Sequence, residues 1–188
     1  ARLQQAGGKP GKIPGGINSN TPVSAAEGIA NTKSANGAVV LRNTKAALYD
    51  VEENLAGWAV RNGDAQINII TDARSLEVLN NKNQAHKFIL NEDGILAVGS
   101  ISKRVNPKNL SHPVLAGGND SPGVIAAGYL HRQGRTVYVV NLSGHYLPDY
   151  NRLKPVASML ENSFNLKVKT VKAGKFYHRF YLPLRMKI

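Results

Sequence analysis

The sequence contains no cysteine, so disulfide bonds, thiolate metal sites and a cysteine nucleophile are all excluded. Carboxylates are also scarce, since three aspartates and glutamates follow residue 100. Metal-dependent nucleases hold their ions largely through carboxylates, and no two histidines here have the spacing of metal ligands. We therefore expect neither a metal ion nor any other cofactor.

Long apolar runs are missing as well. No run approaches the roughly 18 residues needed to span a bilayer, and the N-terminus has no apolar core of a signal peptide. We expect no membrane partner. Because the chain begins at Ala1 rather than at a methionine, we expect a piece of a larger protein.

Positive charge is unevenly distributed along the 188 residues, which carry a formal net charge of +12. Residues 1–100 contain ten lysines and arginines against nine acidic residues, a net of +1, whereas residues 101–188 contain fourteen against three, a net of +11. A basic field confined to one half of a chain is typical of proteins that bind a polyanion, most commonly nucleic acid. A solvated lysine-rich surface is the alternative, and a membrane surface fits less well because the basic residues lie among strand formers.

The composition divides the chain into two parts. Residues 1–37 are rich in glycine and proline and have hardly any large apolar side chains. Such a segment cannot bury enough surface to offset its ordering entropy, so we expect a flexible arm or linker. Residues 38–188 are expected to form one domain.

Apolar side chains recur at helical spacing between residues 44 and 61, with Gly63 as the end of the helix. We expect this apolar stripe to face the core, with Trp58 as an anchor and with Glu52 and Glu53 on the opposite face. The stripe consists of Ala47, Leu48, Val51, Leu55 and Trp58. A second, shorter helix is expected over residues 74–79.

The remaining sequence is typical of strands and turns. Alternation predicts a weak strand over residues 66–71, and two hairpins are predicted over residues 86–98, turning at Asp93-Gly94, and over residues 124–141, turning at residues 132–134. We expect these four strands to form an antiparallel meander. A helix over residues 155–164, a half-buried edge strand over residues 166–171 with a row of lysines, and a last strand over residues 176–182 complete an α+β fold, with N-terminal helices packed on a twisted antiparallel sheet.

The chemistry is expected where the buried strand at residues 137–140 ends and a turn presents His145 and Tyr146. RNA can be cleaved without a metal when one group takes the proton of the 2′-hydroxyl and an acid protonates the leaving oxygen. His145 is the first candidate for base or acid, Tyr146 for a stabilising hydroxyl, and His112, in a polar loop, for the second acid–base group. Each histidine has a purely structural alternative, which for His145 is a residue that closes the corner of the turn.

The other histidines and glycines carry less information. His86 and His131 are expected at strand ends on the surface, and His178 could extend a stripe of phosphate contacts. The pair Gly117-Gly118 could let the backbone approach a phosphate, although flexibility alone also explains it.

Three short motifs resemble a domain found at the C-termini of bacterial polymorphic and contact-dependent growth-inhibition toxins. They are Ser111-His-Pro-Val-Leu-Ala-Gly-Gly118, Ala126-Ala-Gly128 and Ser143-Gly-His-Tyr-Leu-Pro148. A similar series occurs in plant IQ-motif calmodulin-binding proteins, but no IQ motif is present here. The resemblance spans about residues 86–162, and it implies a toxin module that is secreted as part of a larger protein and has a cognate immunity protein. It singles out Ser143 beside the two histidines, Tyr146 and the glycine pair.

We therefore predict a metal-independent endoribonuclease toxin that acts on RNA, with tRNA as one option, in the cytoplasm of a target cell. Its architecture would be analogous to the barnase, colicin and RelE ribonucleases. It would be a monomer or a heterodimer with an acidic immunity protein. The predicted phosphate contacts are Arg132, Arg135, Lys167, Lys169 and Arg179, together with Gly117 and Gly118.

Two alternatives remain open. An ADP-ribosyltransferase toxin would need a catalytic glutamate, yet no glutamate follows Glu161. A non-catalytic module that binds nucleic acid or protein would need no active site at all.

Overall fold

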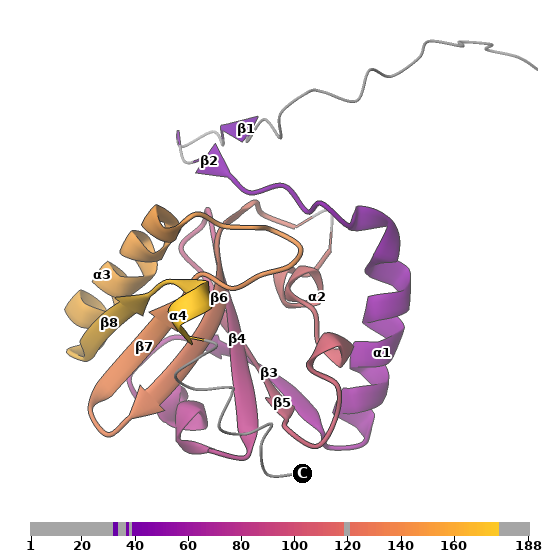
Figure 1. Ribbon diagram of the computed structural model, residues 1–188, viewed down its shortest axis with the longest axis horizontal. Helices are drawn as coiled ribbons and strands as arrows, with labels where there is room; N and C mark the ends of the chain where they lie inside the picture. Colours follow the sequence, from indigo (N-terminus) through magenta and orange to yellow (C-terminus); the bar gives the residue numbers. More distant parts are fainter. Residues whose placement is uncertain (1–31, 34–36, 38, 119–120, 177–188) are drawn as a thin grey trace, which may run out of the picture. The chain divides into compact units, whose positions relative to one another are not determined.

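The computed structural model of the protein describes residues 32–33, 37, 39–118 and 121–176 (Figure 1). Most of the predicted arm over residues 1–37 therefore lies outside the described residues. The same holds for His178, Arg179 and all but the first residue of the predicted last strand.

A six-stranded sheet forms the centre of the domain, in the order β3-β5-β4-β6-β7-β8. All neighbouring strands are antiparallel except β7 and β8, which are parallel. The strands are β3 (Ala65–Ile70), β4 (Gln84–Asn91), β5 (Leu96–Ser102), β6 (Val124–Gln133), β7 (Thr136–Val140) and β8 (Lys167–Val171). Two short strands, β1 (Thr32–Lys33) and β2 (Val39–Val40), pair separately. The predicted α+β class is confirmed.

Both predicted hairpins form, but the predicted meander is wrong. Strand β6 pairs with β4 rather than with β5, because β3 occupies the outer edge of β5. The connection from β5 to β6 is long enough to return the chain to the other side of β4. It contains the 3₁₀ helix η3 (Pro107–Asn109) and the short helix α2 (His112–Ala116). Hairpin signals define a pair of strands, but they do not define which hairpins become neighbours.

Helices pack on both faces of the sheet, not on one. Helix α1 (Tyr49–Arg61), preceded by η1 (Ala46–Leu48), packs with η3 and α2 on one face, and α3 (Leu153–Phe164) packs on the other (Figure 1). The second predicted helix is the 3₁₀ helix η2 (Ser75–Asn80), which lies on the α3 side. The buried core accordingly forms two clusters separated by the sheet. One contains Phe88, Leu130, Val137 and Leu160, and the other contains Ala56, Ile89, Ile101 and Leu115.

Helix α1 forms where predicted, but the predicted face is not the one that is buried. Its buried residues are Ala56 and Ala59, whereas Val51 is 61% exposed and Trp58 is 48% exposed. The prediction that Trp58 anchors the core is therefore wrong. The small alanine side chains let the helix lie close to α2 and β3, and this close packing turns the larger apolar stripe outward.

The C-terminal part follows the prediction more closely. After β7, a loop and the 3₁₀ helix η4 (Tyr150–Arg152) lead into α3, whose Val156 and Leu160 are buried against the sheet. Because α3 crosses over the sheet, β8 runs parallel to β7 and ends the sheet as an edge strand. The short helix α4 (Ala173–Phe176) follows it.

Candidate functional site

A turn follows β7 and contains His145, as predicted. Hydrogen bonds fix the backbone of this turn. The N–H of Tyr146 donates to Ser143 Oγ (3.3 Å), and the N–H of Leu147 donates to the carbonyl of Ser143 (3.1 Å). The backbone N–H and the hydroxyl of Thr44 both donate to the His145 carbonyl, each over 2.8 Å. The loop is thereby tied to the segment that precedes α1.

The ring of His145 forms an ion pair with Glu52 of α1. Its Nε2 lies 2.7 Å from Oε1 of Glu52, and the two side chains are 14% and 13% exposed. The other carboxylate oxygen of Glu52, Oε2, is buried without a hydrogen-bond partner. Sequence reasoning missed Glu52, because it placed this residue on the solvent face of the helix and nothing local links positions 93 residues apart.

His112 is buried, so the prediction that a polar loop presents it is wrong. His112 is the first residue of α2 and is only 3% exposed. Its Nε2 lies 2.9 Å from the carbonyl oxygen of Gly128. Burial, reinforced by the charge of Lys87, lowers the pKa of His112 to about 3. The ring is therefore neutral near pH 7 and donates its proton to a carbonyl that needs a donor.

Lys87 and Tyr146 lie in the same region, between α1, α2 and the sheet. The ammonium of Lys87 donates to the carbonyls of Pro107 (2.6 Å) and Leu110 (2.7 Å), and burial lowers its pKa to about 8. Burial also raises the pKa of Tyr146 to about 12, with Tyr49 and Glu52 acting in the same direction. We refer to Glu52, Lys87, His112, His145 and Tyr146 as the buried polar cluster.

The backbone conformation and close packing at positions 117 and 118 explain why both residues are glycine. Both adopt left-handed conformations, with φ of 86° and 91°. Gly117 ends helix α2, and a Cβ atom at Gly118 would lie 2.9 Å from the ring of Tyr49. The predicted contact of this pair with a phosphate stays a prediction.

His86 is also buried, contrary to the prediction of a surface position. Its Nδ1 lies 2.8 Å from the hydroxyl of Ser100 and its Nε2 lies 3.1 Å from the carbonyl of Asn81. Burial lowers the pKa of His86 to about 4, and burial together with Lys82 and Lys103 lowers that of the half-buried His131 to about 4 as well.

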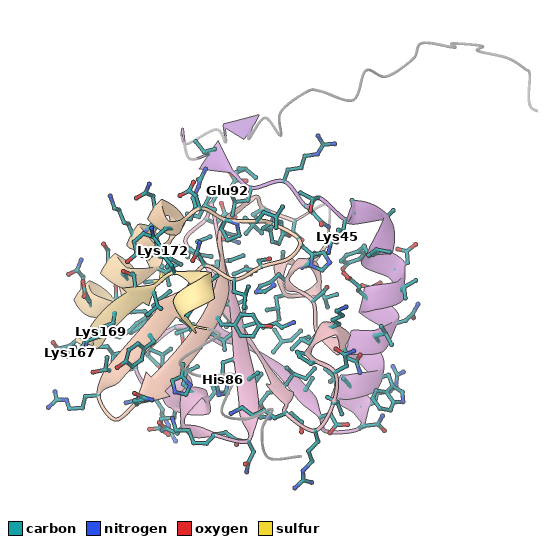
Figure 2. The ribbon with its side chains drawn as sticks, in the orientation of Figure 1. Lys45, His86, Glu92, Lys167, Lys169 and Lys172 are labelled. Carbon is teal, nitrogen blue, oxygen red and sulfur yellow. The ribbon has the colours of Figure 1, made fainter. Side chains whose placement is uncertain are left out.

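Three of the predicted phosphate contacts lie close together. Lys167 and Lys169 are exposed on β8, and the pairing of Thr136 with Lys167 brings the turn with Arg135 beside them. Arg132 lies on the same hairpin, but it pairs with Val137 and so points to the α3 face of the sheet, opposite to the two lysines. Figure 2 shows Lys167, Lys169 and Lys172 together at one side of the domain. We refer to Arg132, Arg135, Lys167, Lys169 and Lys172 as the basic edge.

No residue of the basic edge has an acidic partner within the described part of the chain, where the ion pairs are His145–Glu52 and Arg152–Asp149. Further cations lie beside Arg132. The ammonium of Lys82 donates to the Arg132 carbonyl, and that of Lys103 donates to the Lys82 carbonyl over 2.7 Å. Burial, followed by repulsion from Arg132, lowers the pKa of Lys82. Cations are thus concentrated without compensation.

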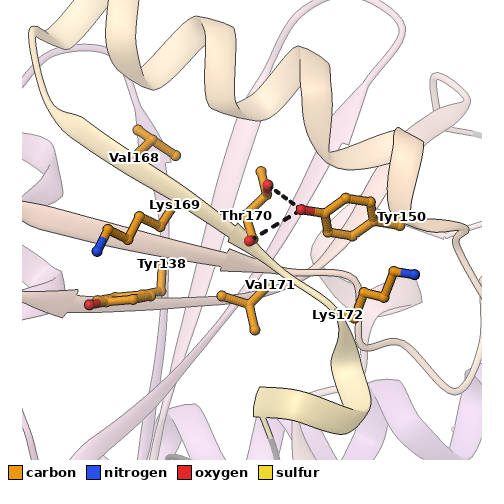
Figure 3. A pocket seen from close by; sticks show the side chains of 7 residues that line it. All are labelled: Tyr138, Tyr150, Val168, Lys169, Thr170, Val171 and Lys172. Atoms are coloured by element: carbon orange, nitrogen blue, oxygen red, sulfur yellow. Dashed lines mark hydrogen bonds between the residues drawn. The ribbon is translucent and has the colours of Figure 1, made fainter.

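An open pocket of about 590 Å³ runs along β8, and aromatic rings contribute to it (Figure 3). The ammonium of Lys169 lies 5.9 Å from the ring centre of Tyr138, and that of Lys172 lies 5.7 Å from the ring centre of Tyr150. The Tyr150 hydroxyl is fixed by Oγ1 of Thr170, at 2.6 Å. Lys172 belongs to the predicted row of lysines but was not among the predicted phosphate contacts. Tyr150 was missed, although an aromatic residue after the predicted turn was a usable signal.

The two predicted sets of residues lie apart from each other. Ser143, His145, Tyr146 and His112 come together, and so do the residues of the basic edge. However, the His145 turn lies beside Thr44 and Lys45, and Figure 2 shows Lys45 on the other side of the domain from Lys167 and Lys169. The predicted acid–base groups and the predicted phosphate contacts therefore do not form one site.

In the described residues no group of three histidine, aspartate or glutamate side chains could hold a metal ion. None of the helices in that part of the chain has the length and apolar character needed to cross a membrane. The chain matches no protein-family model, and neither a curated protein nor a solved structure matches it significantly. The toxin resemblance accordingly stays a prediction.

Proposed function

We propose that this domain binds single-stranded RNA along its basic edge. The observation that carries the proposal is the row of cations on β8 and the neighbouring turn, none of which has an acidic partner in the described residues. Uncompensated cations raise the local concentration of a polyanion and gain free energy when phosphates replace its counterions.

The pocket beside these cations favours a single strand over a duplex. Tyr150 is 37% exposed and its ring centre lies 5.7 Å from the ammonium of Lys172, so a base stacked on this ring would bring its phosphate to an ammonium. Tyr138 is buried beneath Lys169 and offers no such surface. Splayed bases that stack on aromatic side chains are the usual mode of single-stranded RNA recognition. The pocket volume also lies in the range of small-molecule sites, about 300–1,000 Å³.

Fluorescence anisotropy with a labelled single-stranded RNA tests the proposal on the full chain. The double variant Lys167→Glu/Lys169→Glu should bind at least about 10-fold more weakly and lower the salt slope of the affinity by about 2. Arg42→Glu/Lys45→Glu is the matched control, because it changes the charge by the same amount at two exposed cations before α1, and Figure 2 shows Lys45 on the other side of the domain from Lys167 and Lys169. Equal losses in both variants would leave only a general effect of net charge and would refute the proposed edge.

RNA cleavage is a second candidate function, and the ion pair between His145 and Glu52 favours it. In such a pair the Glu52 carboxylate takes the proton of the 2′-hydroxyl, whose oxygen attacks phosphorus. The bond from phosphorus to the 5′-oxygen then breaks, and protonated His145 supplies a proton to that oxygen. Both side chains are, however, largely covered from solvent. The structural alternative is that the pair only holds α1 against the loop after β7.

Glu52→Gln and Glu53→Gln form a matched pair for the second candidate. Glu53 is the neighbouring exposed carboxylate on α1. EDTA-resistant cleavage of total RNA should be lost in Glu52→Gln and in His145→Ala but kept in Glu53→Gln. If the wild-type chain leaves RNA intact and Glu52→Gln lowers the free energy of unfolding by about 1–3 kcal/mol, the pair is structural.

The toxin assignment and its acidic immunity protein are further proposals, supported by the resemblance of the three short motifs and by the basic edge. Expression of the chain inside a bacterial cell should arrest growth, and coexpression of an acidic binding partner should restore it. Labelling of a target that depends on NAD would instead favour the ADP-ribosyltransferase alternative.

A further inference from the structure

Exposed apolar side chains are concentrated at the end of the domain opposite β8 in the sheet order. Seven of the ten exposed large apolar residues in the described part of the chain lie between Leu48 and Ile69. We refer to these seven as the apolar end: Leu48, Val51, Leu55, Trp58, Val60, Ile67 and Ile69. Scattered exposed apolar residues need no explanation, whereas a concentration on two adjoining elements marks an interaction surface.

The two elements present these side chains on the same side of the sheet. Ile67 and Ile69 of β3 pair with Gly99 and Ala97 of β5. A Cβ atom at Gly99 would point into Leu110 and Leu115, which belong to the core cluster under α1 and α2. The two isoleucines therefore face the α1 side, next to the apolar stripe of α1.

Strand β3 also has an unpaired edge. It is the terminal strand of the sheet within the described residues, and its sequence Ala65-Gln-Ile-Asn-Ile-Ile70 contains no charged residue. Edge strands are usually protected from pairing by lysine, proline or a bulge, as the lysines do on β8. An uncharged edge with two isoleucines, 43% and 52% exposed, is suited to pairing with another strand.

We propose that a second copy of this chain covers the apolar end. The two β3 strands pair antiparallel across a two-fold axis, and the two α1 helices pack side by side on the same face. A two-fold contact of this kind is self-complementary, because each strand edge offers the same sequence to the other. The inference goes beyond the proposed RNA binding and does not depend on it.

The charges of α1 select a second copy over another partner. Asp50 lies in the first turn of α1 and Arg61 in the last. In an antiparallel helix pair, Asp50 of one copy approaches Arg61 of the other, and the helix dipoles oppose each other favourably. An acidic partner would meet cations on the basic edge, not on an uncharged strand. In the joined sheet the two basic edges lie at opposite ends, which separates their positive charge.

Cysteine cross-linking tests the strand contact directly, because the chain contains no cysteine of its own. Asn68→Cys places one thiol in the middle of β3, and Lys169→Cys places one on the opposite edge strand. On mild oxidation of the full chain, Asn68→Cys should form a disulfide-linked dimer and Lys169→Cys should form little. No cross-link at position 68, or equal cross-linking of both variants, would overturn the proposed contact.

Sedimentation over a wide range of protein concentration tests the apolar surface independently. The wild-type chain should be dimeric at high concentration, and Leu55→Lys should be monomeric. At concentrations low enough for both to be monomeric, their melting temperatures should agree. Leu147→Lys is the control, since Leu147 is equally an exposed leucine (62%) but lies in the loop after β7. A monomeric wild-type chain, or a dimer that survives Leu55→Lys, would refute the proposal.

Exchange of the helix charges distinguishes a second copy from any other occupant. Arg61→Asp should weaken the dimer, and Asp50→Arg/Arg61→Asp should restore it, because both ends of the antiparallel pair are reversed together. A double variant that stays as weak as Arg61→Asp would contradict the antiparallel helix pair.

Discussion

The two edges of the same sheet have opposite characters. Strand β8 carries exposed lysines and adjoins the β6–β7 hairpin, which carries two arginines, whereas β3 has no charge and exposes two isoleucines. Lysines on an edge repel a neighbouring strand and attract phosphate, while a bare apolar edge attracts a strand. The comparison indicates two separate surfaces, one for a polyanion and one for protein.

The two edges are joined by central strands that leave no room for additional atoms. Gly128 of β6 is the clearest case, since a Cβ atom there would lie 1.8 Å from the carbonyl oxygen of Val140. This glycine belongs to the short Ala-Ala-Gly motif, and its carbonyl also accepts the hydrogen bond from His112. Both edge strands therefore depend on the close packing of the central strands.

Gly128→Ala should disrupt the sheet that carries both edges, and we expect it to have the largest effect on stability. The added methyl group must displace the backbone of β7, so we expect a loss of about 3 kcal/mol or more in the free energy of unfolding. Urea denaturation measures this loss. Gly174→Ala is the control, because a Cβ atom there meets nothing within 4 Å. A loss below about 1 kcal/mol in Gly128→Ala would show that β6 and β7 can separate at little cost.

Acid should weaken the centre of the sheet while both edges keep their lysine and arginine charges. The pKa of His112 is lowered to about 3, with Lys87 and His145 among the charges that face it. Between pH 6.5 and pH 3 the unfolded chain therefore binds a proton that the folded chain does not, so stability falls as the pH falls. For His112 alone the loss between pH 7 and pH 4 is about 3 kcal/mol.

His86 and His131 act in the same direction as His112, since their pKa values are also lowered. Thermal melting between pH 7 and pH 4 tests this effect. His112→Gln should show a clearly smaller loss over that range than the wild-type chain. An equal loss in both proteins would assign the acid sensitivity to other groups.

Tyr150→Ala sharpens the description of the basic edge by separating stacking from charge. Loss of one stacking platform should weaken RNA binding by about 1–2 kcal/mol and leave the salt slope unchanged. Tyr150→Phe keeps the ring but loses the hydrogen bond to Thr170, and it should bind nearly as well as the wild-type chain. Anisotropy titrations at two salt concentrations measure both quantities. If Phe and Ala weaken binding equally, the hydroxyl rather than the ring matters.

Exchange of single residues between the edges should have the smallest effect on stability. Ile69→Lys and Lys169→Ile alter exposed side chains, so each should shift the free energy of unfolding of the dilute monomer by less than about 0.5 kcal/mol. Urea denaturation at low protein concentration measures it. A larger shift would mean that these edge side chains contribute to the stability of the monomer itself, and not only to contacts with partners.

Several local features could be predicted from the sequence because short-range physics determines them. Alternation and the turn residues predicted both hairpins, and the left-handed Gly94 (φ 78°) lies in the predicted turn. The lysine row predicted an edge strand, and a turn does follow β7 at His145, although the His145 ring is largely covered beside Glu52. Each of these rests on a few neighbouring residues.

The errors concern contacts between distant segments. Helical periodicity predicted α1, but it could not show that Ala56 and Ala59, rather than Leu55 and Trp58, would be buried. The pairing of His145 with Glu52 joins positions 93 residues apart, and no local pattern carries it. The same applies to the burial of His112 at the start of α2, where its ring contacts the carbonyl of Gly128.

The sequence by itself determined the positions of most helices and strands, the absence of thiol chemistry and the excess of positive charge in the second half. These follow from residue types and from spacing within a few positions. Only the tertiary structure decided which face of α1 is buried, that helices cover both faces of the sheet, and that His112 and His145 lie apart from the lysine row. Those features depend on how closely distant segments pack, and packing is settled by the shapes of all the side chains together.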